Sequence, residues 1–237
     1  MKKQISDSLH FLVRWTLRGM IGILGASILI TLIYGIFPVP ATPLMLLRQV
    51  QSQPISDVFS FKKKWVPIEK ISTELQAAVI AAEDMNFYEH NGFDWNAIEK
   101  AYKHNEKSRR VRGASTISQQ VAKNVFLWPH RSWVRKGIEV YFTGLIELLW
   151  SKKRILEVYL NVIELGNNLY GVEAASQFYF HKQAYDVNSA EAALIAAVLP
   201  NPRKMHISKP SQYVRFRQSM IIRRMPSAAS AIIQSNE

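Results

Sequence analysis

The sequence predicts a mainly α-helical protein with a single transmembrane helix at its N-terminus. From residue 71 onward, apolar residues recur at the spacing of one helix face, whereas no alternating pattern is long enough to predict a strand. The chain has 237 residues, 48% of them hydrophobic, which suffices for one catalytic domain and an anchor. Three residue pairs have the spacing of a capping box at a helix start: Thr73 and Gln76, Thr116 and Gln119, Asn188 and Glu191.

The N-terminal region predicts a membrane anchor. Residues 19–37 carry no charge and approach the roughly 20 apolar residues that cross a bilayer as a helix. Basic residues precede this stretch and none follows until Arg48, so the positive-inside rule places residues 1–18 in the cytoplasm and the rest outside. A cleaved signal peptide is the alternative, but the apolar run exceeds the ~7 to 15 residues of a signal sequence and no A-x-A site follows.

Prolines end the anchor and open a membrane-proximal linker, expected over residues 38–70. Its apolar patch (44–47) and basic cluster (62–64) fit either a surface beside the membrane or an ordinary packed loop with solvated charges. A catalytic domain is expected over residues 71–225 and a weakly structured C-terminal tail over residues 226–237.

The charge balance indicates an anionic partner. Thirty Lys and Arg against 18 Asp and Glu give a formal net charge of +12, which suits nucleic acid, a membrane surface or a phosphorylated substrate. Charge alone does not choose among these. The chain has no Cys, which excludes a disulfide scaffold, a Cys-ligated zinc site and a thiol nucleophile.

The segment EDMNFYEHNG, residues 83–92, places two acids at the end of an apolar, alanine-rich helix. There Glu83 meets the negative end of the helix dipole and apolar surface, and both effects favour the neutral carboxyl. Such a group is a better base than a solvated glutamate. The alternative is an ordinary solvated acid at a helix end.

The segment RGASTISQQVAKN, residues 112–124, predicts a capped helix with a polar face. Unpaired N–H groups at a helix start bind anions, and this face adds hydrogen-bond donors and one cation but no acid. A phosphate-bearing ligand would suit it. The alternative is a capped helix with a solvated polar side. The residues of this face are Thr116, Gln120, Lys123 and Asn124.

The segment RSWVRKGIE, residues 131–139, leads into a long amphipathic helix. Arg135 and Glu139 stand one turn apart, which predicts an i,i+4 ion pair or else a cation and an acid presented together to a charged reacting centre. Upstream, Trp128 and Trp133 among basic residues fit either an interfacial membrane anchor or an ordinary loop. The helix has an apolar stripe, Ile138, Tyr141, Phe142, Leu145 and Leu149, and a second stripe, Glu139, Thr143 and Glu147.

Five segments in order resemble the sequence blocks of the peptidoglycan glycosyltransferases: EDMNFYEHNG, GASTISQQVAKN, RKGIE, KKRILEVYLN and SAEAALIAAVLPNP. The resemblance covers about residues 71–202 and continues through a basic helix that includes Arg215, Arg217, Arg223 and Arg224. Because the chain ends soon afterwards, it is similar to the monofunctional members of the family. It implies a lysozyme-like, two-lobed helical domain. The smaller lobe would dip into the membrane, and a donor and an acceptor site would lie along one cleft.

The resemblance implies catalytic roles for two acids. Glu83 matches the general base that takes the proton from the acceptor sugar, and Glu139 matches a second essential acid near the phosphates. Lys123 and Arg135 match cations around the departing diphosphate. Ser118 stands where the family more often has Thr, which keeps the hydroxyl. The other matched positions line the donor site, Ser115, Thr116, Gln120 and Asn124, or shape the first block, Asp84, Phe87 and His90.

The same resemblance implies the substrates, cofactor and setting. Lipid II and the growing glycan chain are the expected substrates, joined through β-1,4 links with release of undecaprenyl diphosphate. A divalent cation, Mg or Mn, is expected to assist, with ligands that the sequence does not identify. Membrane lipids and division or elongation proteins are the expected partners, and nucleic acid is not. The anchor would lie in the bacterial inner membrane and the domain in the periplasm.

Two functions from other classes remain open. A lysozyme-like hydrolase or lytic enzyme would also use a lone Glu in a helical domain, but it would need no basic, hydroxyl-rich diphosphate site. A non-catalytic membrane scaffold of the cell wall machinery would use the positive charge only to meet the lipid surface.

Overall fold

The computed structural model describes residues 2–52, 61–108, 113–130 and 132–235. These residues form two compact units, of which the first ends at Phe37 and the second begins at Pro38. Helices dominate both units, which confirms the predicted mainly α-helical class.

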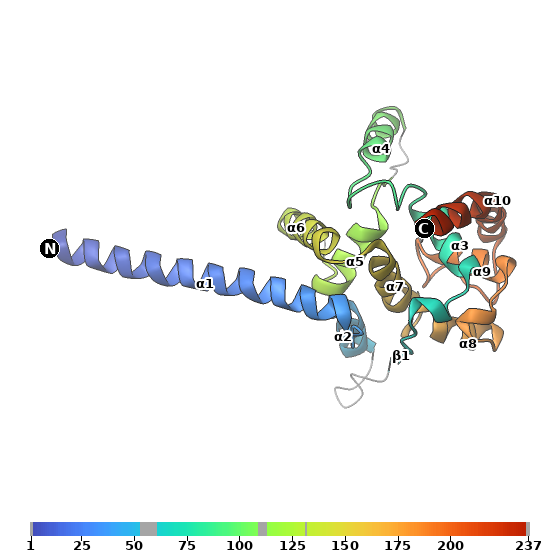
Figure 1. Cartoon of the computed structure of the whole chain (residues 1–237), viewed down its shortest axis with the longest axis horizontal. Helices are drawn as coiled ribbons and strands as arrows, with labels where there is room; N and C mark the ends of the chain where they lie inside the picture. Colours follow the sequence, from blue (N-terminus) through green and yellow to red (C-terminus); the bar gives the residue numbers. More distant parts are fainter. Residues whose placement is uncertain (1, 53–60, 109–112, 131, 236–237) are drawn as a thin grey trace. The chain divides into compact units, whose positions relative to one another are not determined.

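The first unit is α1 (Lys2–Ile36), drawn in blue in Figure 1 as one continuous helix. Within it, Val13–Ile36 is long and apolar enough to cross a membrane, and it is the only such helix in the described part of the chain. The helix therefore begins well before residue 19, where the apolar stretch was predicted to start. Backbone hydrogen bonding continues through the polar residues that precede an apolar stretch, so helix and membrane boundaries need not coincide.

Three helices pack against one another in the core of the second unit: α3 (Thr73–Glu83), α9 (Ser189–Val198) and α10 (Gln212–Gln234). Five consecutive residues of α3, 77–81, are buried, so the helix is enclosed on all sides there. Its small alanine side chains allow neighbouring helices to approach, and a helix that is apolar all round is buried. The helix that ends at Glu83 therefore runs through the interior of the domain.

Helix α10 continues past Pro226, so the prediction of a weakly structured tail from that residue is wrong. Proline lacks an N–H and removes one hydrogen bond from the helix. The burial of Met225, Ala228 and Ile232 keeps the helix against the core on both sides of that position. The folded domain therefore extends to Ser235, whereas residues 236 and 237 lie outside the described residues.

A second group of helices surrounds α5 (Ile117–Phe126), which packs against α6 (Trp133–Leu149) and α7 (Lys152–Val162). The buried residues of α6 are Glu139, Thr143 and Ile146, so its predicted polar stripe faces the protein.

The other side of α6 exposes apolar side chains to the surroundings. Trp133 is 92% exposed, Val134 70% and Leu148 80%. A surface helix of a soluble domain normally presents polar side chains to water, so these exposed apolar side chains are unusual. The helix also buries Ile146, and Phe142 stacks on Phe126 of α5.

The described parts of the predicted linker are folded into the second unit. In α2 (Pro43–Ser52), Met45 is fully buried, and this helix contacts α5. Residues 53–60 lie outside the described residues. The short helix η2 (Ile68–Lys70) then leads into the domain core. The 44–47 patch thus belongs to a packed helix, which favours the packed-segment interpretation for that part of the linker.

A small sheet also forms, which the sequence did not predict. β1 (Lys62–Lys63) pairs in parallel with β3 (Leu169–Tyr170), and β3 pairs antiparallel with β2 (Glu164–Gly166). Strands of two or three residues are too short to show an alternating pattern.

Two of the three predicted capping boxes are confirmed, those that begin at Thr116 and Asn188. The third is wrong, because Ser72 caps α3 one residue before Thr73. The Gln76 side chain donates instead to backbone carbonyl groups that precede the helix.

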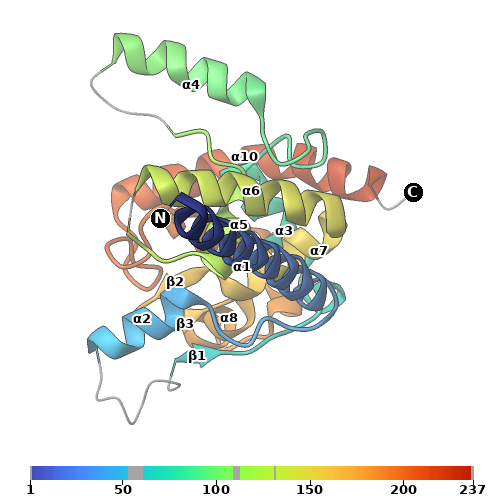
Figure 2. The same ribbon diagram turned by 90° about the vertical axis from the view of Figure 1, so that its left-hand side faces the viewer.

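Helix α4 (Trp95–Lys107) stands away from the other helices of the second unit in both views (Figure 1, Figure 2). Ala101 is its only buried residue. Of the remaining elements, α8 (Val172–Phe180) contacts the small sheet and α9, and η3 (Ala184–Asp186) contacts α8.

Candidate active site

Glu83 is the last residue of α3 and is partly buried at the edge of a cleft. Burial raises the pKa of its carboxyl above the ordinary value, and the neighbouring charge of Asp84 raises it further. A hydrogen bond from Gln120 and the charges of Arg217 and Lys123 lower the pKa and oppose this shift. The net effect is a raised pKa, in the direction predicted for an acid between apolar surface and a helix end.

Gln120 connects Glu83 to the interior of the domain. Its Nε2 donates a hydrogen bond to Glu83 Oε2 at 2.8 Å, and its Oε1 accepts one from the Tyr159 hydroxyl at 3.0 Å. The amide of Gln120 is therefore held from both ends.

Asp84, the C-cap of α3, is buried and occupied by protein partners. Its Oδ2 accepts the backbone N–H of Ile117 at 2.9 Å, and both of its oxygens lie 3.0 Å from His90 Nε2. Because His90 Nδ1 accepts the Gly92 N–H, the ring proton lies on Nε2 and points to Asp84. Asp84 thus joins the end of α3 to the start of α5.

Thr116 fixes the same junction from the other side. Its hydroxyl donates to the Gly92 carbonyl at 2.7 Å and caps α5 through Gln119. Gly92 has φ +88°, and a Cβ there would lie 2.8 Å from Thr143 Cγ2, so only glycine fits. Thr116 was predicted to line a ligand site, but in this structure its hydroxyl serves the protein itself.

Two adjoining clefts meet at Ser115 and Gln120. The first, here called the base cleft, has a volume of about 710 Å³. It lies between the end of α3, α4, α10 and the segment before α5. The residues that give it charge are Glu83, Asp84, Asp94, Lys100, Arg217 and Arg224.

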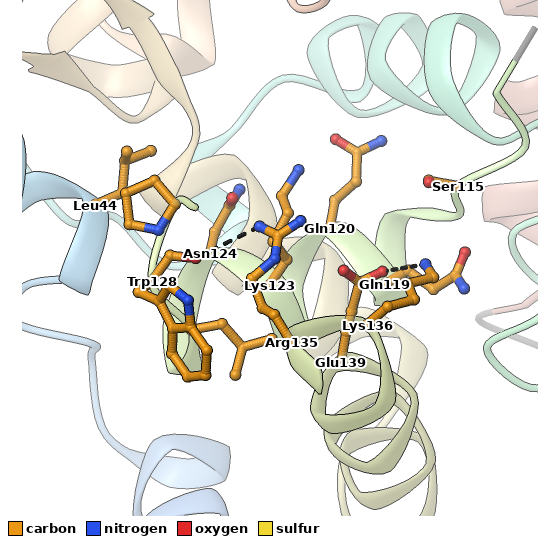
Figure 3. Close-up of a pocket in the computed structure, with 12 residues that line it drawn as sticks. Leu44, Ser115, Gln119, Gln120, Lys123, Asn124, Trp128, Arg135, Lys136 and Glu139 are labelled. Carbon is orange, nitrogen blue, oxygen red and sulfur yellow. Dashed lines mark hydrogen bonds and ion pairs between the residues drawn. The ribbon is translucent and has the colours of Figure 1, made fainter. Parts of the chain in front are cut away.

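The second, here called the cation cleft, has a volume of about 390 Å³ and lies between α5 and α6. Ser115 and Gln120 also line the base cleft, so the two clefts share a boundary. In Figure 3, Gln120, Lys123 and Asn124 leave α5 in the same direction, with Arg135 beside them. The polar residues of this cleft are Ser115, Gln119, Gln120, Lys123, Asn124, Arg135, Lys136 and Glu139.

Of the two interpretations of Arg135 and Glu139, the i,i+4 ion pair is wrong. Glu139 Oε1 instead lies 2.5 Å from Lys136 Nζ, whereas an Arg135 guanidinium N–H donates to the Trp128 carbonyl at 3.4 Å (Figure 3). Lys136 stands three residues before Glu139, a spacing that brings two side chains together on a helix surface as the i,i+4 spacing does. Arg135 is left facing the cation cleft, where its Nε has no hydrogen-bond partner among the described residues.

The structure therefore brings together all nine residues that the sequence predicted for the site. Glu83 and Asp84 lie on the base cleft, and Ser115 and Gln120 on both clefts. Thr116 lines the base cleft, and the remaining members line the cation cleft: Lys123, Asn124, Arg135 and Glu139.

Sequence reasoning gave no site role to several residues of these clefts. Arg217 and Arg224 come from α10, and Lys100 comes from α4. The two arginines belong to the basic helix through which the resemblance continues, and only the packing of α10 on α3 brings them to the base cleft. Lys136 was quoted within RKGIE but given no role, and Tyr159 lay in a segment read as structural.

A preformed metal centre does not fit the described residues. No three His, Cys, Asp or Glu side chains come together among them. Glu139, the one acid of the cation cleft, is already paired with Lys136.

Comparison with known proteins identifies the family. The family described as Transglycosylase matches residues 51–226. A biosynthetic peptidoglycan transglycosylase of Bdellovibrio bacteriovorus is 54% identical over 222 residues, which cover 92% of this chain and 89% of that protein. The protein of the same name from Bacteroides thetaiotaomicron is 53% identical over 214 residues, covering 90% of this chain and 86% of the relative.

A third biosynthetic peptidoglycan transglycosylase, from Yersinia pestis, is 50% identical over 213 residues, covering 89% of this chain and 88% of the relative. The matches therefore include both clefts and extend over nearly the whole of each relative. With its helical domain, the buried acid at the end of α3 and the cationic cleft beside it, this chain belongs to the transglycosylase family, whose domain is lysozyme-like.

Proposed function

We propose that this chain polymerises lipid II into β-1,4-linked glycan strands, with Glu83 as the general base. The observation that carries the proposal is the shared boundary of the two clefts at Ser115 and Gln120. It places the partly buried carboxylate of Glu83 on one side of this boundary and the cations of the second cleft on the other. Such an arrangement suits a base and a leaving-group site.

In the proposed reaction, the 4-hydroxyl of the acceptor sugar attacks the anomeric carbon of the donor. A new carbon–oxygen bond forms at that carbon while its bond to the diphosphate oxygen breaks, and the configuration inverts. Ionised Glu83 accepts the hydroxyl proton as the bond forms. Its raised pKa makes it a stronger base than a solvated carboxylate, provided that the pH leaves it ionised.

The cation cleft would hold the diphosphate. Lys123 and Arg135 line it, and fixed cations stabilise the negative charge that grows on a departing diphosphate. Lys136 would add a third cation. Glu139 Oε1 lies 2.5 Å from Lys136 Nζ and holds this ammonium group in place. Glu139 would thus act by positioning a cation.

A divalent cation remains a prediction. Mg²⁺ usually binds through one or two carboxylates together with substrate phosphates. Since the described residues form no cage of three acidic or imidazole ligands, such an ion would take most of its ligands from the substrate. Among the residues that line the cation cleft, Glu139 is the one acid that could contribute a protein ligand.

We further propose that the anchor lies in the bacterial inner membrane, with the N-terminus in the cytoplasm and the domain in the periplasm. The single apolar helix and the basic residues before it support this topology. The exposed apolar side of α6 supports a second contact with the lipid surface, as expected for the smaller lobe of the domain.

One experiment separates the proposed function from its two rivals. The detergent-solubilised protein is incubated with lipid II and Mg²⁺, and the products are resolved with and without a muramidase. Long strands that the muramidase cuts support the proposal. Shortening of glycan added beforehand would indicate a hydrolase, and absence of both reactions in folded protein would indicate a scaffold.

A further inference from the structure

Tyr159 is a buried residue of α7 that lines neither cleft and donates a hydrogen bond to Gln120. The side chain is 1% exposed, and its hydroxyl donates to Gln120 Oε1 at 3.0 Å. The same amide donates from Nε2 to Glu83 Oε2 at 2.8 Å. Three side chains from α7, α5 and α3 thus form a directed chain of hydrogen bonds that ends on the proposed base.

The direction of this chain matters because a glutamine amide has two different ends. With NH₂ toward Glu83, it stabilises the ionised carboxylate; with the carbonyl oxygen toward Glu83, it would stabilise the protonated acid instead. Reversing the amide would turn its NH₂ group toward Tyr159, and the buried hydroxyl proton would lose the Gln120 oxygen as its acceptor. The tyrosine therefore disfavours the reversed orientation.

We propose that Tyr159 is a positioning residue that holds the Gln120 amide with its NH₂ toward Glu83, and so extends to lower pH the range in which the base is ionised. This inference rests on the proposed role of Glu83. It assigns to Tyr159 a function in catalysis without contact with either substrate.

Tyr159 is suited to this task because it stays a donor. Burial raises the pKa of its hydroxyl well above the ordinary value, and the charges of Glu83 and Asp84 act in the same direction. The hydroxyl is therefore protonated throughout the range in which Glu83 titrates.

Other charges also act on Glu83 and would remain when Tyr159 is changed. Lys123 on α5 and Arg217 on α10 favour ionisation, and Asp84 opposes it. Lys100 and Arg224 line the same cleft. Tyr159 therefore shifts the pH at which Glu83 ionises, whereas Glu83 still titrates when the tyrosine is changed.

The test is the pH profile of polymerisation by the full-length protein with Tyr159→Phe, using lipid II. We expect the acid limb of kcat to move to higher pH by about half a unit to one unit, the equivalent of one lost hydrogen bond. The plateau rate at high pH and the KM should change by less than about twofold, since no substrate contact is lost.

Tyr170→Phe is the matched control. Tyr170 is also fully buried, but its hydroxyl has no hydrogen-bond partner within the described ranges, and it lies on β3 in the small sheet. Its removal should leave the acid limb where it was. An equal shift in this variant would mean that losing any buried hydroxyl has the effect, and it would overturn the proposal.

A double-mutant cycle tests whether the effect passes through Gln120. In a Gln120→Ala background, Tyr159→Phe should add no further shift of the acid limb. An unchanged limb in the single Tyr159→Phe variant, or an equal additional shift in the double variant, would overturn the inference.

Two further measurements keep the test decisive. If Tyr159→Phe does not fold, a fluorinated tyrosine at position 159 replaces it, since this residue keeps the shape of the side chain and strengthens the hydroxyl donor. The acid limb of kcat should then move to lower pH. An unmoved limb would overturn the proposal. Glu83→Gln is measured in the same assay. Continued polymerisation by this variant would refute the role of Glu83 itself. If Glu83→Gln is inactive but the acid limb does not move in the Tyr159 variant, only the role of Tyr159 is refuted.

Discussion

Asp84 Oδ2 accepts the backbone N–H of Ile117 at 2.9 Å, and this bond ties the residue after Glu83 to the first turn of the helix that carries Lys123. The two residues are far apart in the sequence, so the bond fixes a tertiary distance. His90 donates to the same carboxylate and holds it in place. The separation between the proposed base and the cations therefore depends on Asp84, a buried acid whose oxygens accept hydrogen bonds from the protein itself.

Asp84→Asn should weaken this junction. The new NH₂ group can accept neither the Ile117 N–H nor the His90 proton, so one buried donor loses its partner. We expect the free energy of unfolding to fall by roughly 1 to 3 kcal/mol, with a loss of polymerisation that follows the loss of structure. Denaturant unfolding in detergent measures the first quantity.

Glu99→Gln provides the control for Asp84→Asn. Glu99 pairs with Lys103 on exposed α4, where both side chains are well solvated. Such pairs add little to stability, so this variant should unfold like the parent protein. Equal stability of all three proteins would show that the Asp84 contacts do not hold the junction.

Glu83→Gln should abolish polymerisation and leave the domain folded. The amide keeps the shape of the acid but cannot accept a proton from a sugar hydroxyl at neutral pH. Glu89→Gln is the matched control, because Glu89 is an exposed acid in the same segment and should be dispensable. Strand synthesis by Glu83→Gln at the parent rate would remove Glu83 from the mechanism.

The same substitution should also change the pH dependence of stability. Folding raises the pKa of the Glu83 carboxyl, so its stability contribution is fully present below the unfolded-state pKa and is lost as the pH rises through the folded-state pKa. Glu83→Gln should therefore melt at a higher temperature than the parent at neutral pH, and the difference should vanish near pH 4. A lower melting temperature at neutral pH would contradict the raised pKa.

The sequence predicted local features of this fold better than the contacts between distant segments. The capped starts of α5 and α9 and the acid at the end of α3 follow from short patterns, and the structure has them. The approach of Arg217 to Glu83 depends on how α10 packs on α3, which no local pattern contains. The continuation of α10 beyond Pro226 was missed for the same reason.

The pairing of Glu139 shows where spacing misleads. An i,i+4 arginine and an i,i+3 lysine compete for one carboxylate, and the sequence alone does not show which face of α6 is buried. In the structure Glu139 faces inward and Lys136 reaches it, which leaves Arg135 for the cation cleft. The predicted residues thus lie on two adjoining clefts, whereas Glu139 pairs with Lys136 and not with Arg135.

Lys123→Met should lower kcat strongly without unfolding the protein. Methionine keeps the length of the side chain but removes the charge that would stabilise the departing diphosphate, and we expect a loss of about 10²- to 10³-fold. Lys153→Met is the matched control, since Lys153 pairs with Glu69 on another face and lines neither cleft. Steady-state polymerisation rates check both. A similar loss in the two variants would point to a general effect of charge.

The exposed apolar side of α6 should bind lipid. Trp133 and Leu148 are 92% and 80% exposed, and contact with a bilayer would remove both from water. In a version of the protein that lacks residues 1–37, Trp133→Ser combined with Leu148→Ser should reduce sedimentation with anionic vesicles several-fold. Tyr185→Ser removes an aromatic ring of 64% exposure from η3 and should leave binding unchanged. Because the basic surface is intact in both variants, electrostatic attraction alone predicts equal binding, and that result would exclude α6 as the lipid-facing side of the domain.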